Sequence, residues 1–168
     1  MAEAVLNWAT IMEAIQDELE AVLNAAGTAA FAQVFIGEPI GLPVGGPYAC
    51  AWYLGRTLAT SAGGSYETMG NVMYAARIQV LCLWPMQPER ATLESWEADI
   101  ATIDTNIRRA FHANRTINSN ITDLRILDSD NGYGDLPASH AAGAPRNLYR
   151  VLQMEIRLDN LEGEAIAP

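Results

Sequence analysis

Residues 147–159 alternate strictly between two sets of side chains, and this alternation constrains the fold more than any other feature. One set comprises Leu148, Arg150, Leu152, Met154, Ile156 and Leu158, and the other Tyr149, Val151, Gln153, Glu155 and Arg157. Successive side chains of a strand point to opposite faces, so a period of two predicts a β-strand. Residues 72–84 repeat the pattern, with Ile78, Val80, Cys82 and Trp84 opposed to Arg77, Gln79, Leu81 and Leu83. The second of these faces turns apolar toward its end, so we expect something to cover it there.

Two segments have helical rather than strand periodicity. Residues 3–25 carry an apolar stripe of Trp8, Ile11, Met12, Ile15, Leu19, Val22 and Leu23. Residues 90–113 carry a second stripe of Leu93, Trp96, Ile100, Ile103, Ile107 and Phe111. Steps of three and four residues predict amphipathic helices that pack on a core. In the second helix, acids come early and Arg108, Arg109 and His112 come late, which matches the helix dipole. His112 is therefore interpreted as a cation matched to the helix dipole or as a surface residue, rather than as a catalytic base.

The remaining segments complete an α+β plan. Residues 31–36, 48–58 and 121–128 read as further strands, and segments rich in Gly, Pro or Ser at 37–47, 59–71 and 129–146 read as loops. The segment 59–71 is interpreted as a long hairpin tip, or as one that orders only when something docks on it. The order predicts a mostly antiparallel sheet of about five strands with two helices packed on one face. We expect a single domain over residues 1–168, with a frayed tail at 160–168.

Charge and composition exclude several function classes. The chain has 20 acidic residues and 10 basic ones, a formal net charge of −10, and every one of its cations is arginine. Without lysine it has no Walker A loop, kinase β3 lysine, Schiff-base lysine or Ser-Lys dyad. A basic patch that binds nucleic-acid phosphates is not expected either. The sequence shows no targeting segment and no apolar run long enough to span a membrane.

The residues that carry catalysis or bind metals do not converge in this sequence. Cys50 and Cys82 lie in apolar runs and are interpreted as buried free thiols, with a disulfide between neighbouring strands left open. The residues 128–132 resemble the start of a calcium loop, although ordinary turn chemistry accounts for them equally and a weak cation site stays open. A Ser-His-Asp set from Ser139, His140 and Asp135 has poor geometry because the first two are adjacent. We therefore expect no enzyme, no cofactor and no metal.

Two features point to a partner instead. The three long loops are unusual in a compact domain and are commonly functional. Apolar side chains also stand on both faces near some strand ends, and surplus apolar surface is often an assembly interface. Ordinary cover by the two helices is the alternative explanation. The candidate assembly residues are Pro39, Leu42, Pro43, Tyr66, Met69, Leu83, Trp84, Tyr133 and Tyr149.

The arrangement resembles the tail terminator proteins of long-tailed bacteriophages. The resemblance lies in the order of elements and covers nearly the whole chain, without a diagnostic motif. It begins with the helix near Trp8–Leu23 and the strand and Pro/Gly loop at Val34–Pro47. It continues with the hairpin that ends in Ala76-Arg77-Ile78-Gln79-Val80 and the long helix Leu93–Phe111. It closes with the strands at Ile121–Ile126 and Leu148–Ile156.

This resemblance implies a structural role without catalysis. Members of the family form a homohexameric ring that caps the tail tube, stops its polymerisation and receives the head connector. The implied partners are other copies of the chain, the tail tube protein, the head connector or neck protein, and double-stranded DNA that passes through the lumen. The implied location is the tail or neck of the virion, and the host cytoplasm during assembly. An acidic lumen would let DNA slide, because it repels phosphates.

Other interpretations of the sequence remain open. A second junction component, such as a head-closure or neck ring protein, has a similar size and also acts by ring assembly. A tail tube subunit is also possible, but such subunits usually carry a longer β-rich core and less helix than this sequence predicts. From a different class, a small cytoplasmic α+β binding domain or enzyme would need a pocket lined by titratable groups with perturbed pKa values.

Overall fold

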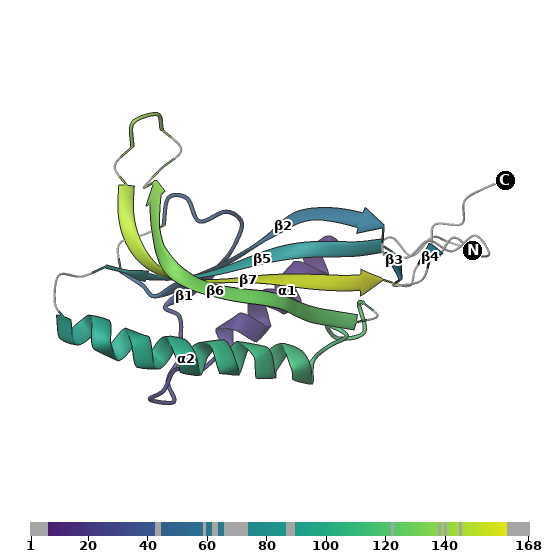
Figure 1. Cartoon of the computed structure of the whole chain (residues 1–168), viewed down its shortest axis with the longest axis horizontal. Coiled ribbons are helices and arrows are strands. Elements are labelled where there is room, and N and C mark those ends of the chain that lie inside the picture. Colours follow the sequence, from purple (N-terminus) through teal and green to yellow (C-terminus); the bar gives the residue numbers. More distant parts are fainter. Residues whose placement is uncertain are drawn as a thin grey trace.

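The described residues of the chain form two helices and seven strands, which Figure 1 labels. The computed structural model describes residues 7–42, 45–58, 60–61, 64–65, 74–86, 90–121, 123–137, 139, 141–144 and 146–160. The elements are α1 (Trp8–Glu20), β1 (Gln33–Ile36), β2 (Tyr48–Leu58), β3 (Thr60–Ser61), β4 (Gly64–Ser65), β5 (Tyr74–Pro85), α2 (Arg90–Ala113), β6 (Asp123–Pro137) and β7 (Arg146–Asn160). The predicted α+β class is confirmed.

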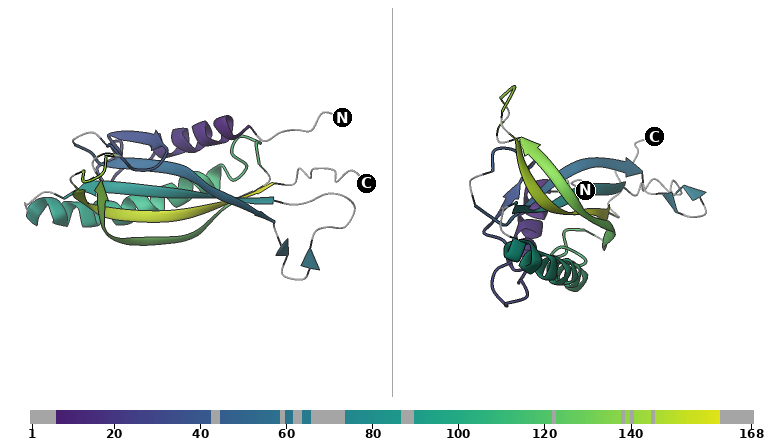
Figure 2. Two further views of the ribbon diagram at one scale, coloured as in Figure 1. Left: turned by 90° about the horizontal axis from the view of Figure 1, so that it is seen from above. Right: turned by 60° about the vertical axis from the view of Figure 1, so that its left-hand side comes forward.

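Five of the strands form one sheet in the order β1-β2-β5-β7-β6. The pairs β2–β5, β5–β7 and β7–β6 are antiparallel, and only the four-residue strand β1 runs parallel to its neighbour β2. Strands β3 and β4 make a separate two-stranded hairpin. The sheet twists strongly, and the β6–β7 hairpin rises from one end of it (Figures 1 and 2).

The main core lies between the sheet and the two helices. The buried side chains of α1 include Ile11, Ile15 and Leu19, and those of α2 include Ile100, Ile103, Ile107 and Phe111. They pack in one cluster with Ile78, Val80, Cys82 and Trp84 of β5 and with Leu152, Met154, Ile156 and Leu158 of β7. The period-two and helical stripes predicted these faces, and burial of their apolar area is the main driving force for the fold.

A second, smaller apolar cluster lies on the opposite side of the sheet, which we call the outer face. It consists of Tyr48, Cys50, Leu81, Leu83 and Tyr149. Partly buried side chains pack against it, and one of them, Leu42, comes from the Pro/Gly loop at 37–47. The expectation that something covers the apolar end of this face is therefore confirmed, and the cover includes a side chain from that loop.

The structure corrects the predicted bounds of three segments. Helix α1 ends at Glu20, well before the predicted residue 25. Strand β6 continues to Pro137 instead of ending at residue 128, so the first half of the predicted loop 129–146 is strand. Pairing with β7 along its whole length holds this Asp- and Gly-rich stretch extended, which overrides its local preference for turns. Residues 60–61 and 64–65 form β3 and β4, while the rest of 59–71 and the tail 161–168 lie outside the described residues.

The connection between α2 and β6 is a tight left-handed turn. Ile117, Asn118 and Ser119 all have positive φ angles, of 44°, 54° and 67°. This conformation is unfavourable for a β-branched residue. The side chain of Ile117 is fully buried, and the Asn114 side-chain oxygen accepts a hydrogen bond from the Asn118 N–H at 2.9 Å. Core packing and this bond thus hold the turn that sets α2 beside β6.

Candidate functional site

Four of the nine predicted assembly residues are buried within the folded chain. Leu83, Trp84 and Tyr149 are 0%, 1% and 5% exposed, and Pro39 is also buried. Trp84 faces the main core, whereas Leu83 and Tyr149 belong to the outer-face cluster. This corrects the prediction for these four residues, because side chains packed within the chain offer no surface to a partner. The apolar surplus in the sequence belongs largely to a second core.

The other five residues divide into two groups. Tyr133 is 65% exposed, and Leu42 is half-buried. Pro43, Tyr66 and Met69 lie outside the described residues. Tyr133 and Leu42 therefore stay as candidates, one on the β6–β7 hairpin and one on the Pro/Gly loop.

The structure adds Leu148 to these candidates, at the end of the molecule where the hairpin rises. Its side chain is 49% exposed. Together with Leu42, Met86 and Asn147 it lines a shallow cavity of about 240 Å³. We call Leu42, Met86, Tyr133 and Leu148 the hairpin-end surface. The strict alternation gives Leu148 the same face as Leu152, and only the structure shows that it extends beyond the core.

Arg150 holds the hairpin against α2. Its guanidinium donates to the carboxylate of Glu97 at 2.7 and 3.1 Å, to the carbonyl oxygen of Gly132 at 2.8 Å and to the side chain of Asn131 at 3.2 Å. It also lies 5.1 Å from the centre of the Tyr133 ring. The hydrogen bond from Arg150 lowers the pKa of Glu97. One buried cation therefore joins three elements and orients the exposed Tyr133.

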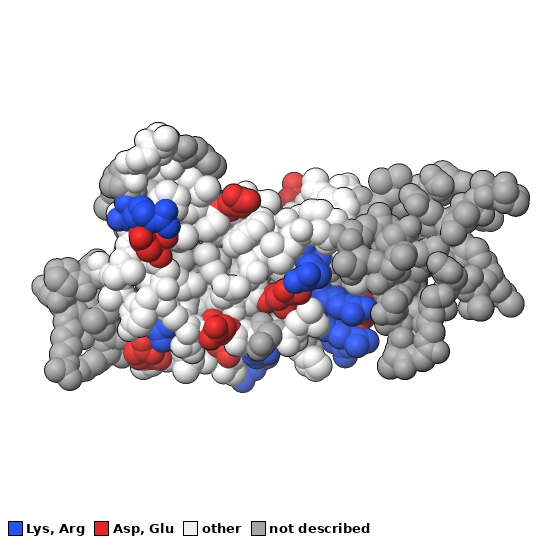
Figure 3. Space-filling view, turned by 45° about the horizontal axis from the view of Figure 1, so that its top comes forward, with Lys and Arg blue, Asp and Glu red and all other residues white. Residues whose placement is uncertain are grey.

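Three arginines stand in one row across the outer face. Arg157 on β7 is the register partner of both Arg77 on β5 and Arg125 on β6. Like charges directly opposite each other destabilise a sheet, so each needs an anion. Figure 3 shows arginines and carboxylates side by side on this face. Each arginine has one: Arg77 pairs with Glu155 at 2.5 Å, Arg157 with Asp159 at 2.7 Å and Arg125 with Asp123 at 3.0 Å.

A groove runs between α2 and the edge strand β6, and we call it the basic groove. It measures about 550 Å³ and is lined by Arg108, Arg109, His112, Arg115 and Arg125, with Phe111, Leu124 and Ile126 among its apolar residues. Arg108 donates to Asp104 at 3.1 Å and to Ser129 at 2.6 Å, and Arg115 makes two hydrogen bonds to Asp123 at 2.8 and 2.9 Å. Four of the ten arginines thus meet at one surface of an acidic protein.

Helix α1 presents acids on its outer surface. Glu13, Asp17 and Glu20 are exposed and follow one another at steps of four and three residues. We call them the α1 acid stripe. Like charges at this spacing cost about 0.2–0.5 kcal/mol per pair, and acids in the last turn oppose the helix dipole. No basic residue lies in the last turn of α1. The stripe therefore weakens the isolated helix slightly.

Both cysteines are free and buried, as the sequence predicts. Cys50 belongs to the outer-face cluster and Cys82 to the main core, so their side chains point to opposite faces. A disulfide between them is excluded by this geometry. Burial raises the pKa of Cys50 to about 12 and raises that of Cys82 as well. Both thiols stay protonated near neutral pH and are poor nucleophiles.

The carboxylates that pair with arginines predict loss of stability in acid. Hydrogen bonds from Arg77 and Arg150 lower the pKa values of Glu155 and Glu97; for Asp123, burial acts upward but the bonds from Arg125 and Arg115 outweigh it. A lowered folded-state pKa means that the unfolded chain binds protons first as the pH falls. We therefore expect the urea midpoint to hold near neutral pH and to fall between about pH 5 and pH 3. An unchanged urea midpoint across this pH range would contradict the lowered pKa values assigned to these carboxylates.

No protein-family model matches the chain, and a search of curated proteins finds no match. Among the described residues, no helix is long and apolar enough to cross a membrane, and no group of three or more His, Cys, Asp or Glu side chains is placed to hold a metal ion. The fold defines an α+β protein with a five-stranded sheet.

Proposed function

We propose that this chain is a structural protein of a bacteriophage virion, a tail terminator. Copies would form a ring that caps the tail tube, stops its growth and joins it to the head connector, with DNA passing through the lumen. The observation that carries the proposal is the order of elements. A helix, a short strand with a Pro/Gly loop, a long hairpin, a long helix and a final hairpin follow one another as in the family that the sequence resembles.

The hairpin-end surface supports this proposal. Tyr133 and Leu148 expose 65% and 49% of their surface on a hairpin that rises from the sheet (Figure 1). Arg150 fixes the hairpin to α2, and an exposed ion pair between Asp135 and Arg146, at 2.9 Å, lies next to its turn. Exposed aromatic and aliphatic side chains on a projecting hairpin are typical of an assembly contact. We assign this surface to the tail tube.

The test uses the purified protein and tail tubes imaged by negative-stain electron microscopy. We expect rings at one end of each tube, and tubes that no longer lengthen when tube protein is added. The double substitution Tyr133→Asp with Leu148→Asp should abolish capping, because two charges would be buried in the contact. The matched control is Leu54→Asp on β2, since Leu54 is similarly exposed, at 44%, but lies outside the hairpin-end surface.

Three results would count against the proposal. Rings that form but leave the tubes uncapped would instead favour a head-closure or neck protein. A chain that never touches tubes would point to the binding-domain alternative. Capping that survives the double substitution would remove the hairpin-end surface from the contact, provided that circular dichroism shows the variant to be folded.

A further inference from the structure

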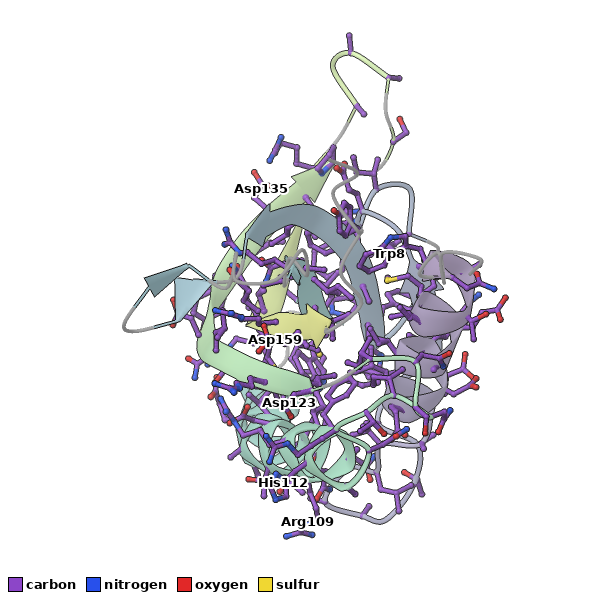
Figure 4. All side chains as sticks on the ribbon, turned by 90° about the vertical axis from the view of Figure 1, so that its right-hand side faces the viewer. Trp8, Arg109, His112, Asp123, Asp135 and Asp159 are labelled. Carbon is purple, nitrogen blue, oxygen red and sulfur yellow. The ribbon has the colours of Figure 1, made fainter. Side chains whose placement is uncertain are left out.

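The basic groove contains one arginine and one histidine that make no pair with another described residue. Arg109 and His112 are exposed, and within the described part of the chain neither makes an ion pair or a side-chain hydrogen bond. They project from the last turns of α2, at the lower edge of Figure 4, away from the labelled Asp123 and Asp159. The other groove arginines are held by Asp104 and Asp123. The groove thus combines arginines that are held by carboxylates with one arginine and one histidine that are open to a partner.

The α1 acid stripe has the complementary charge. No ion pair among the described residues joins Glu13, Asp17 or Glu20 to an arginine. The end of α2 contacts α1 at one point, where Asn114 donates a hydrogen bond to Glu18 at 2.7 Å. In Figure 4, however, Arg109 and His112 lie at the lower edge of the view and α1 lies at the right. Among these described residues no ion pair joins the two surfaces within one chain, and association of two copies would bring them together.

We propose that the basic groove of one copy docks the α1 acid stripe of a second copy. Such a contact is heterologous, because each partner contributes a different surface. Every copy then keeps one free surface of each kind, so the contact repeats and produces a closed ring or an open chain of subunits. This inference rests on the proposed ring function and deepens it by naming the surfaces through which copies meet. Its test uses no tail tubes, so the inference and the proposed function can each fail independently.

The test is a charge swap followed by sedimentation velocity. One variant carries Glu13→Arg, Asp17→Arg and Glu20→Arg, and the other carries Arg109→Glu and His112→Glu. Each alone should lose at least about tenfold in self-association affinity, because like charges then face each other. In an equimolar mixture, each variant meets the opposite charge on its partner, so association should return. Glu38→Arg is the matched control, since it reverses an exposed acid outside both surfaces.

Neutral changes separate the contact from folding. Arg109→Gln with His112→Gln removes the two basic side chains without adding acids at the end of a helix, and it should weaken association less than the reversal does. Added salt should weaken wild-type association, because exposed charges are screened. Circular dichroism checks that each variant is folded.

The outcomes are decisive in both directions. Restored association in the mixture, with neither variant associating alone, supports the contact. A mixture that stays monomeric where the wild type associates would overturn it, as would either variant associating like the wild type. A wild-type chain that is monomeric in solution yet caps tubes would overturn this inference and leave the terminator proposal standing. Association through this contact without any capping of tubes would overturn the terminator proposal and leave this inference standing.

Discussion

Replacing Trp84 with alanine is expected to lower the free energy of unfolding by about 3–5 kcal/mol. The indole is 1% exposed and packs in the main core, with its ring centre 6.4 Å from that of Phe31. Removing it deletes a large apolar contact and leaves a cavity that the neighbouring strands cannot fill. Because the free energy of unfolding of such domains is only about 5–15 kcal/mol, this one substitution would remove a large share of it.

Urea denaturation followed by tryptophan fluorescence measures this loss, and Trp96→Ala is the control. The stripe on the second helix also predicts Trp96 as a core residue, but the structure leaves it only partly buried against the edge of the cluster. We therefore expect a clearly smaller loss at Trp96. Equal losses at the two positions would mean that the first half of α2 packs more deeply than described.

The second large effect concerns the ion pair between Arg150 and Glu97, whose two members are unequally buried. The side chain of Arg150 is 8% exposed, and that of Glu97 is 54% exposed. Glu97→Ala leaves a buried cation without its anion, and we expect a loss of about 2–3 kcal/mol, below that of a fully buried pair. Arg150→Met leaves only a solvated carboxylate, so its loss should be smaller.

Thermal or urea unfolding of both variants tests this asymmetry. Asp135→Ala is the control, because it breaks a pair whose side chains are 55% and 56% exposed. Exposed pairs contribute about 0–1 kcal/mol, so this change should be nearly neutral. A larger loss for Arg150→Met than for Glu97→Ala would show that the hydrogen bond to the Gly132 carbonyl, rather than charge balance, dominates at this position.

The sequence predicts those parts of the fold whose side chains repeat with a clear period. The strands at 48–58, 72–84 and 147–159 and the helix at 90–113 all lie within two residues of their observed bounds. Residues 129–137 were not predicted as strand, because Asp, Asn and Gly favour turns locally. They form a strand because they pair with β7. Glycine suits position 134 in this strand, since a Cβ atom there would lie only 2.8 Å from Val151 Cγ2.

The candidate surfaces were harder to predict than the fold. Leu83 and Tyr149 look like surplus apolar surface in the sequence, because nothing there indicates that Leu42 folds back over them. The basic groove combines Arg108 and Arg109 on α2 with Arg125 on β6, and these residues are separated in the sequence. Their proximity depends on the left-handed turn at 117–119 that lays β6 along α2. Residues that only the tertiary structure brings together leave no periodic pattern in the sequence.

The position of β7 has a consequence for synthesis of the protein. This strand is the last in the order of elements, yet it lies between β5 and β6 inside the sheet. While the ribosome is still making it, the backbone edge of β5 and the core side chains of both helices have no neighbour there. Nascent chains on a polysome would therefore be open to premature contacts with one another. The edge of β5 is covered and the sheet is complete only after residue 160 has emerged from the exit tunnel.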